Sequence, residues 1–141
     1  MPSLLLHIGT HKTGTTAIQS FFEANAPALE KRRLLYPLFE TRWPQRVAPN
    51  RNGYFLNRAA LHRLGAETDE QDERRALECV ARLAAWAQGN ADAAALLSDE
   101  RMWFSGALHE GYWEAVKAIA ESMGFDRMQV YQPGEKLKGL A

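Results

Sequence analysis

Leu-Leu-Leu-His-Ile-Gly-Thr-His-Lys-Thr-Gly-Thr-Thr occupies residues 4–16 and is the most informative part of the chain. The continuous apolar run at its start is typical of a buried parallel strand. The run stops at Gly9, and a stretch compatible with a helix begins at Thr15. Where strand, tight loop and helix follow one another in this way, several backbone N–H groups and the positive end of the helix dipole converge on one point. The sequence therefore predicts a binding site for a phosphate or sulfate group.

The loop has the glycine spacing of the nucleotide-binding P-loop, G-x-x-x-x-G-K-[ST], but its lysine is displaced. Gly9 and Gly14 fill the glycine positions and Thr16 fills the last one, whereas Thr15 stands directly after Gly14 and Lys12 lies two residues before it. In the ordinary motif the lysine spans the β- and γ-phosphates, and the last hydroxyl holds a magnesium ion. A displaced cation contacts a different part of the ligand, so the sequence disfavours a nucleoside triphosphate.

Residues 12–16, Lys-Thr-Gly-Thr-Thr, with Gln19 and Phe21 after them, resemble the 5′-phosphosulfate-binding loop of the sulfotransferases that use 3′-phosphoadenosine-5′-phosphosulfate (PAPS). The bacterial branch of that family is the most similar, and weaker similarity continues through residues 34–37 and 96–100. The resemblance implies PAPS, or its product adenosine 3′,5′-bisphosphate, as the nucleotide. It implies that the cofactor-binding residues are Gly9, Thr10, His11, Lys12, Thr13, Gly14, Thr15 and Thr16.

Lys12 is the residue to which we assign charge stabilisation. In sulfuryl transfer, negative charge builds up on the oxygen that bridges sulfur and the 5′-phosphate, and a nearby ammonium stabilises this charge more in the transition state than in the ground state. The acceptor hydroxyl must also lose a proton as it attacks, which requires a general base.

Two carboxylates are the leading candidates for this base. Glu100 follows an apolar strand expected at residues 93–98, on the same edge of the sheet as the loop. Glu40 follows a short strand expected at residues 34–36, and the resemblance implies that related sulfotransferases often place a catalytic carboxylate there. The catalytic candidates are therefore Lys12, Glu100 and Glu40, with His109, His62 and His11 as further candidates for the base.

The sequence departs from the sulfotransferase pattern near residue 132. In that family an arginine at the end of a strand and a serine on the next helix bind the 3′-phosphate of the nucleotide. Residues 128–131 are the corresponding strand, but Gln132 stands where the arginine is expected and no serine follows it. We therefore divide the chain into a partial sulfotransferase-like α/β domain, residues 1–131, and a non-matching tail, residues 132–141. We expect the chain to be an N-terminal fragment, or a truncated or frame-altered relative, of such a sulfotransferase. Without the residues that bind the 3′-phosphate it should bind the nucleotide more weakly, and it is inactive if that contact is essential.

Length and composition are those of a single domain of 141 residues. The 17 Lys and Arg residues balance the 17 Asp and Glu residues, which argues against broad electrostatic binding to nucleic acid or to an anionic membrane. The single cysteine, Cys79, cannot form an internal disulfide, and no apolar stretch is long enough to span a membrane. We therefore expect a cytoplasmic protein without a membrane span or a nucleic-acid partner, and an inert thiol in the core.

Strands are expected at residues 4–8, 34–36, 93–97 and 128–131, and helices at residues 28–33, 55–64 and 112–123 as well as after the loop and after residue 68. Such alternation implies βαβ units and a parallel sheet. The predicted fold class is α/β, a three-layer parallel sheet with helices on both faces, similar to the P-loop nucleoside triphosphate hydrolases but incomplete.

Finer expectations concern individual side chains. Thr68 and Gln71 are expected to form a capping box. The long loop at residues 40–53 is expected to carry the solvated arginines Arg42, Arg46 and Arg51. Side chains expected to face the core are Ile18, Phe21 and Phe22 in the first helix and Leu77, Val80, Leu83, Ala84 and Ala87 in a later one.

Two other functions remain open. The first is a P-loop kinase or nucleoside triphosphatase, because the strand at 93–97 followed by Asp99 and Glu100 resembles a Walker-B strand, although Ser98 stands where the magnesium-linked aspartate is expected. The second is a non-catalytic module that binds an anion or a partner protein, with a homodimer that buries the unfinished sheet edge. For the sulfotransferase no metal is required, and the acceptor hydroxyl belongs to a carbohydrate, a lipid or a small molecule.

Overall fold

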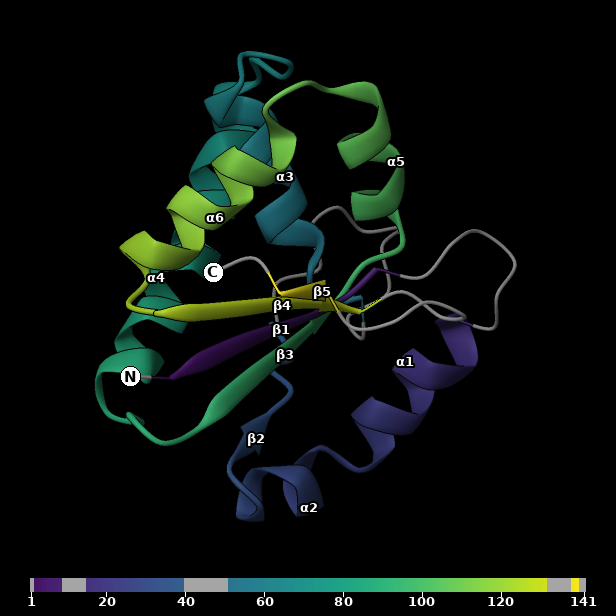
Figure 1. Cartoon of the computed structure of the whole chain (residues 1–141), viewed down its shortest axis with the longest axis vertical. Coiled ribbons are helices and arrows are strands. Elements are labelled where there is room, and N and C mark those ends of the chain that lie inside the picture. The colour runs from purple at the N-terminus through teal and green to yellow at the C-terminus, as the bar shows by residue number, and fades with distance from the viewer. Residues whose placement is uncertain (1, 9–14, 40–50, 132–137, 140–141) are drawn as a thin grey trace.

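The computed structural model describes residues 2–8, 15–39, 51–131 and 138–139 of the chain. These residues form one sheet with helices on both of its faces (Figure 1). In chain order the elements are β1 (Ser3–His7), α1 (Thr15–Ala24), α2 (Ala26–Lys31), β2 (Leu34–Leu35), α3 (Tyr54–Arg63), α4 (Glu70–Gln88), β3 (Ala94–Ser98), α5 (Arg101–Leu108), α6 (Tyr112–Ser122), β4 (Arg127–Tyr131) and β5 (Lys138–Gly139). No helix among the described residues is both long and apolar enough to cross a membrane.

Strand β1 lies at the centre of the described sheet, whose order is β2-β3-β1-β4-β5. It pairs in parallel with β3 and β4, β2 is parallel to β3, and β5 runs antiparallel to β4. His7 at the end of β1 is therefore in register with Ser98 on one side and Tyr131 on the other. The parallel strands β1 to β4 and their helices confirm the predicted α/β class. Strand β5 lies in the segment 132–141 and extends the edge beside β4.

Two helical layers cover the sheet unequally. Helices α3, α4, α5 and α6 lie over one face, and α1 and α2 lie over the other (Figure 1). Because successive side chains of a strand point to opposite faces, Leu4 and Leu6 are fully buried beneath the four-helix layer, whereas Leu5 on the opposite face is only half-buried. The four-helix layer therefore covers most of the apolar core.

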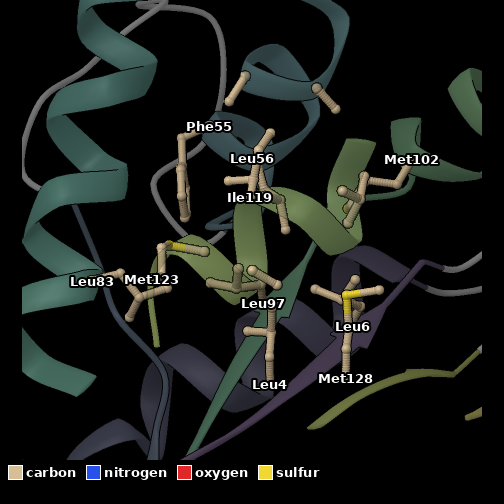
Figure 2. Packing of buried hydrophobic residues seen from close by; sticks show 14 of the residues in the cluster. Leu4, Leu6, Phe55, Leu56, Leu83, Leu97, Met102, Ile119, Met123 and Met128 are labelled. Carbon is tan, nitrogen blue, oxygen red and sulfur yellow. The ribbon is translucent and has the colours of Figure 1, made fainter. Parts of the chain in front are cut away.

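Figure 2 shows how this core is filled. Leu4, Leu6 and Leu97 rise from the strands toward Leu56 of α3 and Ile119 of α6. Burying one such side chain stabilises the fold by about 1.5–3 kcal/mol relative to leaving it in water. The central strands and two helices of the four-helix layer are therefore bound into one hydrophobic unit.

Helix α1 turns a different face toward the sheet than the sequence predicts. Phe21, expected to face the core, is 61% exposed, and Phe22 is half-buried against the ring of Tyr36, with 5.3 Å between the ring centroids. Gln19 is buried instead, at 4% exposure, because its side-chain amide donates a hydrogen bond to the hydroxyl of Ser98. A polar anchor thus overrides the apolar pattern of this helix.

The N-terminus of α4 also differs from the prediction. The N-cap is Asp69, whose carboxylate accepts hydrogen bonds from the backbone N–H groups of Gln71 and Asp72. The predicted capping box of Thr68 and Gln71 is therefore wrong, since the aspartate one position later satisfies the same unpaired N–H groups.

The buried face of α4 is narrower than expected. Leu77 is 50% exposed, whereas the small side chains of Ala76 and Cys79 are buried and let α4 approach α3 closely. The predicted core position of Cys79 is confirmed, and burial raises the pKa of its thiol to about 11, which disfavours the reactive thiolate. Of the remaining predicted core positions, Leu83 and Ala87 are buried and Val80 and Ala84 are partly buried.

Gly106 on α5 provides a test of the packing between α5 and α6. A Cβ at this position would lie 2.5 Å from Nε1 of Trp113, whose ring packs against the core. Alanine is favoured over glycine in a helix by about 1 kcal/mol, but overpacking a tight contact costs about 1–3 kcal/mol. We predict that Gly106→Ala lowers the free energy of unfolding in urea by up to about 2 kcal/mol, which is the overpacking cost less the gain in helix propensity.

Gly89→Ala is the matched control. Gly89 ends α4 with φ −95°, and the nearest atom to a Cβ there is 3.9 Å away. An alanine is compatible with this backbone, so the control is expected to be at least as stable as the wild-type protein. If Gly106→Ala proved as stable as this control, the contact with Trp113 would not be tight in solution.

Candidate functional site at the carboxyl edge of the sheet

The carboxyl ends of β1, β3 and β4 meet at one edge of the sheet. His7, Ser98 and Tyr131 end these strands in register, and α1 begins at the same end of the sheet (Figure 1). In open parallel sheets, ligands bind at this edge, beyond the ends of the strands. The site is therefore built from the residues that immediately follow the strands and from the helices that begin there.

Only part of the predicted anion loop lies within the described structure. Gly9, Thr10, His11, Lys12, Thr13 and Gly14 fall outside the described residues, as does Glu40. The elements on either side of the loop are as predicted, because β1 ends at His7 and α1 begins at Thr15, with Thr16 in its first turn. The strand and helix that should flank an anion loop are thus present at the expected edge.

The hydroxyl of Ser98 lies at the centre of a buried hydrogen-bond cluster. Nδ1 of His7 lies 3.0 Å from Ser98 Oγ, and Nε2 of Gln19 donates to the same oxygen at 3.0 Å. Burial raises the pKa of Tyr36, and a hydrogen bond to Ser98 opposes that shift. Ser98 is fully buried, so it is a structural residue that joins β1, α1 and the end of β2 to β3.

His7 provides an uncharged imidazole at the end of β1. Its exposed fraction is 4%, and desolvation lowers its pKa below the ordinary value of 6.5. The ring stacks on Tyr131 with 5.9 Å between centroids, and Nε2 has no hydrogen-bond partner among the described residues. His7 is therefore buried with one ring nitrogen bonded and the other without a partner among the described residues.

The lowered pKa of His7 gives a pH dependence with a defined sign. The unfolded chain takes up the proton near pH 6.5, whereas the folded chain resists it, so the free energy of unfolding falls as the pH drops below 6.5. We predict that His7→Gln, which has no titrating ring, reduces this loss between pH 7.5 and pH 5.5 in urea titrations. Parallel curves for wild type and variant over that window would contradict the prediction, whatever the difference in absolute stability.

Asp99, the first residue after β3, is held by Arg51. Asp99 is fully buried, and its Oδ1 accepts hydrogen bonds from Nε of Arg51 at 3.0 Å and from the backbone N–H of Arg101 at 2.9 Å. Nη2 of Arg51 also lies 2.9 Å from Oδ1, without hydrogen-bond alignment. Desolvation raises the pKa of Asp99, and the guanidinium of Arg51 opposes this shift.

The predicted solvation of Arg51 is wrong. Its side chain is only 17% exposed, because the buried carboxylate of Asp99 requires a cationic partner. Arg42 and Arg46, which carried the same prediction, lie outside the described residues.

Asn52 and Gly53 fasten the segment before α3 to the end of β3. The side chain of Asn52 donates to the carbonyl oxygen of Leu96 at 2.9 Å and accepts from the backbone N–H of Ser98 at 2.7 Å. The backbone N–H of Gly53 donates to the carbonyl oxygen of Ser98 at 3.0 Å. A Cβ on Gly53 would lie 3.1 Å from the carbonyl carbon of Ser98, so this approach favours glycine. The sequence prediction placed these residues in a loop and missed the clamp.

Replacing Asn52 tests the clamp. In Asn52→Ala, a buried N–H and a buried carbonyl lose their partners, and each unsatisfied group costs about 1–3 kcal/mol. We predict that the free energy of unfolding in urea falls by about 2–6 kcal/mol, the sum for the two groups. Asn25→Ala is the control, because Asn25 makes an exposed side-chain bond to the carbonyl of Phe21, and its loss should cost about 1 kcal/mol or less. Equal losses in the two variants would contradict the clamp.

Glu100 lies where the sequence predicts, directly after the end of β3 at the N-terminus of α5. It is half-buried, and its carboxylate has no ion-pair or hydrogen-bond partner within the part of the chain that the structure describes. A carboxylate without a partner at this edge remains a suitable general base. Its catalytic role stays a prediction.

His62, a further candidate for the base, has a structural role. Its side chain is 2% exposed, with Nε2 bonded to the carboxylate of Asp72 and Nδ1 3.1 Å from the carbonyl oxygen of Glu67. Arg58 bonds to the same carboxylate at 2.9 Å and to Glu67 at 3.2 Å. This network links α3 to α4, away from the strand ends.

A cleft of about 620 Å³ opens between α3 and α5, next to the carboxyl edge. This volume lies within the range of small-molecule sites. Among the described residues, no three His, Cys, Asp or Glu side chains gather in a way that would hold a metal ion. The cleft is lined by Arg51, Tyr54, Asn57, Arg58, Leu61, Glu67, Arg101, Phe104, Ser105, Leu108 and His109.

Comparison with known proteins identifies no family for this chain. No protein-family model matches the sequence, no curated protein is significantly similar to it, and no solved structure matches its fold. The resemblance to the sulfotransferases therefore stays a prediction that depends on residues 12–16 and their position between β1 and α1.

Proposed function

We propose that the chain is a PAPS-dependent sulfotransferase, or the N-terminal part of one. The observation that carries the proposal is the junction between β1 and α1. The strand ends at His7 and the helix begins at Thr15, so the Lys-Thr-Gly-Thr-Thr segment joins the central strand of a parallel sheet to a helix N-terminus. Loops that bind phosphate or sulfate groups occupy this kind of junction.

The sheet topology supports a P-loop-like arrangement. After β1 the chain builds β2 and β3 on one side of the central strand and then crosses to β4 on the other side. The loop that follows β1 therefore belongs to a topological switch point, where nucleotides bind in doubly wound sheets.

The proposed reaction is an in-line transfer of the sulfuryl group. The acceptor oxygen attacks sulfur, the bond between sulfur and the bridging oxygen breaks, and adenosine 3′,5′-bisphosphate leaves. Lys12 and the N–H groups of the loop stabilise the charge on the leaving oxygen. Glu100 or Glu40 takes the proton of the acceptor hydroxyl.

The environment of Asp99 supports this reaction over nucleoside triphosphate hydrolysis. The carboxylate of Asp99 is fully buried, and one of its oxygens is taken by Arg51 and by a backbone N–H. A Walker-B carboxylate must instead face a magnesium ion. Ser98, at the position where that aspartate is expected, is also fully buried.

Calorimetric titration with adenosine 3′,5′-bisphosphate tests the proposal. We predict binding by the wild-type chain without magnesium, and at least about tenfold weaker binding by Lys12→Ala, because a charge-assisted contact to the 5′-phosphate is lost. Lys31→Ala, which removes an exposed lysine of α2, is the matched control and should bind like the wild type.

Three results would count against the proposal. Equal binding by Lys12→Ala and the wild type would refute the role of Lys12. Tighter binding of ATP with magnesium than of adenosine 3′,5′-bisphosphate would favour a kinase or triphosphatase. Binding of the bisphosphate without transfer from PAPS to any hydroxyl acceptor would favour a non-catalytic anion-binding module.

A further inference from the structure

Two helices face each other across the cleft with rows that mix polar and apolar residues. The row on α3 is Tyr54, Asn57, Arg58 and Leu61, and the row on α5 is Arg101, Phe104, Ser105 and Leu108. Both rows have the i, i+3, i+4, i+7 spacing that places residues on one face of a helix. Helices that pack directly bury apolar rows at this spacing. These rows border an open space of about 620 Å³ instead.

The charges of the cleft are largely balanced, with one local exception. Arg51 pairs with Asp99, and Arg58 pairs with Glu67 and Asp72. Arg101 is exposed, and its guanidinium has no ion-pair partner within residues 2–8, 15–39, 51–131 and 138–139. Binding of a polyphosphate would require several cationic side chains without ion-pair partners. The single guanidinium of Arg101, which is unpaired among the described residues, is instead suited to one carboxylate group.

Other groups of the cleft suit a hydroxylated ring. Asn57 is 3% exposed, and its Oδ1 accepts from the hydroxyl of Tyr112 at 2.7 Å, so its amide nitrogen remains to bond a ligand. Ser105 and His109 add further hydrogen-bonding groups to the lining. The ring of Phe104 is 38% exposed and offers an apolar surface beside these polar groups.

We propose that the cleft between α3 and α5 binds a sugar acid. Its carboxylate pairs with Arg101, its hydroxyls bond Asn57 and Ser105, and one face of its ring packs on Phe104. Glu100, the candidate base, directly precedes Arg101 at the start of α5, but it is not one of the residues that line the cleft. Binding of the sugar acid follows from the cleft alone, whereas its role as the sulfuryl acceptor rests on the proposed function.

Titration of the ¹⁵N-labelled chain with D-glucuronate, followed by amide NMR shifts, tests the site. We expect saturable shifts in α3 and α5, and at least about tenfold weaker binding by Arg101→Gln, since a charge-assisted bond is lost. Arg101→Lys keeps the charge and should recover part of the affinity. Arg127→Gln is the matched control, because Arg127 is exposed at the start of β4, at the opposite edge of the sheet.

Two related probes separate the parts of the proposal. D-glucose lacks the carboxylate and acetate lacks the hydroxylated ring, so each should bind more weakly than D-glucuronate. Shifts confined to other elements, or equal affinity of wild type and Arg101→Gln for D-glucuronate, would overturn the site. Equal binding of acetate and D-glucuronate would overturn the assignment to a sugar acid.

Adenosine 3′,5′-bisphosphate distinguishes failure of this site from failure of the proposed function. If D-glucuronate binds to α3 and α5 but the nucleotide does not bind the wild-type chain, the cleft is supported and its role as an acceptor site is overturned. If the nucleotide binds but D-glucuronate produces no shifts in α3 and α5, the sugar-acid site is overturned and the nucleotide site stands.

Discussion

The end of β3 buries two polar side chains in succession, and the rest of the structure depends on pairing them. Ser98 and Asp99 are both fully buried. A buried hydroxyl without a hydrogen bond costs roughly 2–7 kcal/mol, and an unpaired buried carboxylate costs far more. Their partners come from four separate parts of the chain, namely His7, Gln19, Tyr36 and Arg51. The need to pair two adjacent residues therefore draws β1 and both helical layers to one point.

The same bonds determine the shape of the site. Gln19 ties the middle of α1 to β3, so the N-terminus of α1 has a fixed place relative to the strand ends. Arg51 and Asn52 tie the start of α3 to β3 from the other side, while α5 begins directly after β3. Helices α3 and α5 are thus anchored close together at one end, and the cleft between them follows from that common anchor.

The hydrophobic pattern predicted most elements of the core, but it did not reveal the polar network. Apolar runs predicted β1, β3 and β4 to within one residue, and helical spacing predicted α6. The partners in the network are far apart in sequence, 48 positions for Arg51 and Asp99 and 79 for Gln19 and Ser98, so no local pattern reports them. Helix α5 was missed because it is short, Arg101–Leu108, and only Met102 and Ser105 in it are buried, so few of its residues carry the pattern that marks a core helix.

The pairing of Arg51 with Asp99 is better explained by orientation than by stability. The free energy needed to desolvate two charges is about as large as the free energy gained from their attraction. Well-packed apolar residues of similar size would therefore stabilise the fold equally well. An apolar pair could not direct a guanidinium toward the cleft. In the observed pair, Nε of Arg51 bonds the buried carboxylate, and the side chain also lines the cleft, stacked over the ring of Tyr54 at 5.3 Å. The buried carboxylate of Asp99 thus holds the guanidinium of Arg51 in a fixed position at the cleft. The negative charge of Asp99 also offsets the positive charge of Arg51, so Arg51 attracts a polyphosphate less strongly.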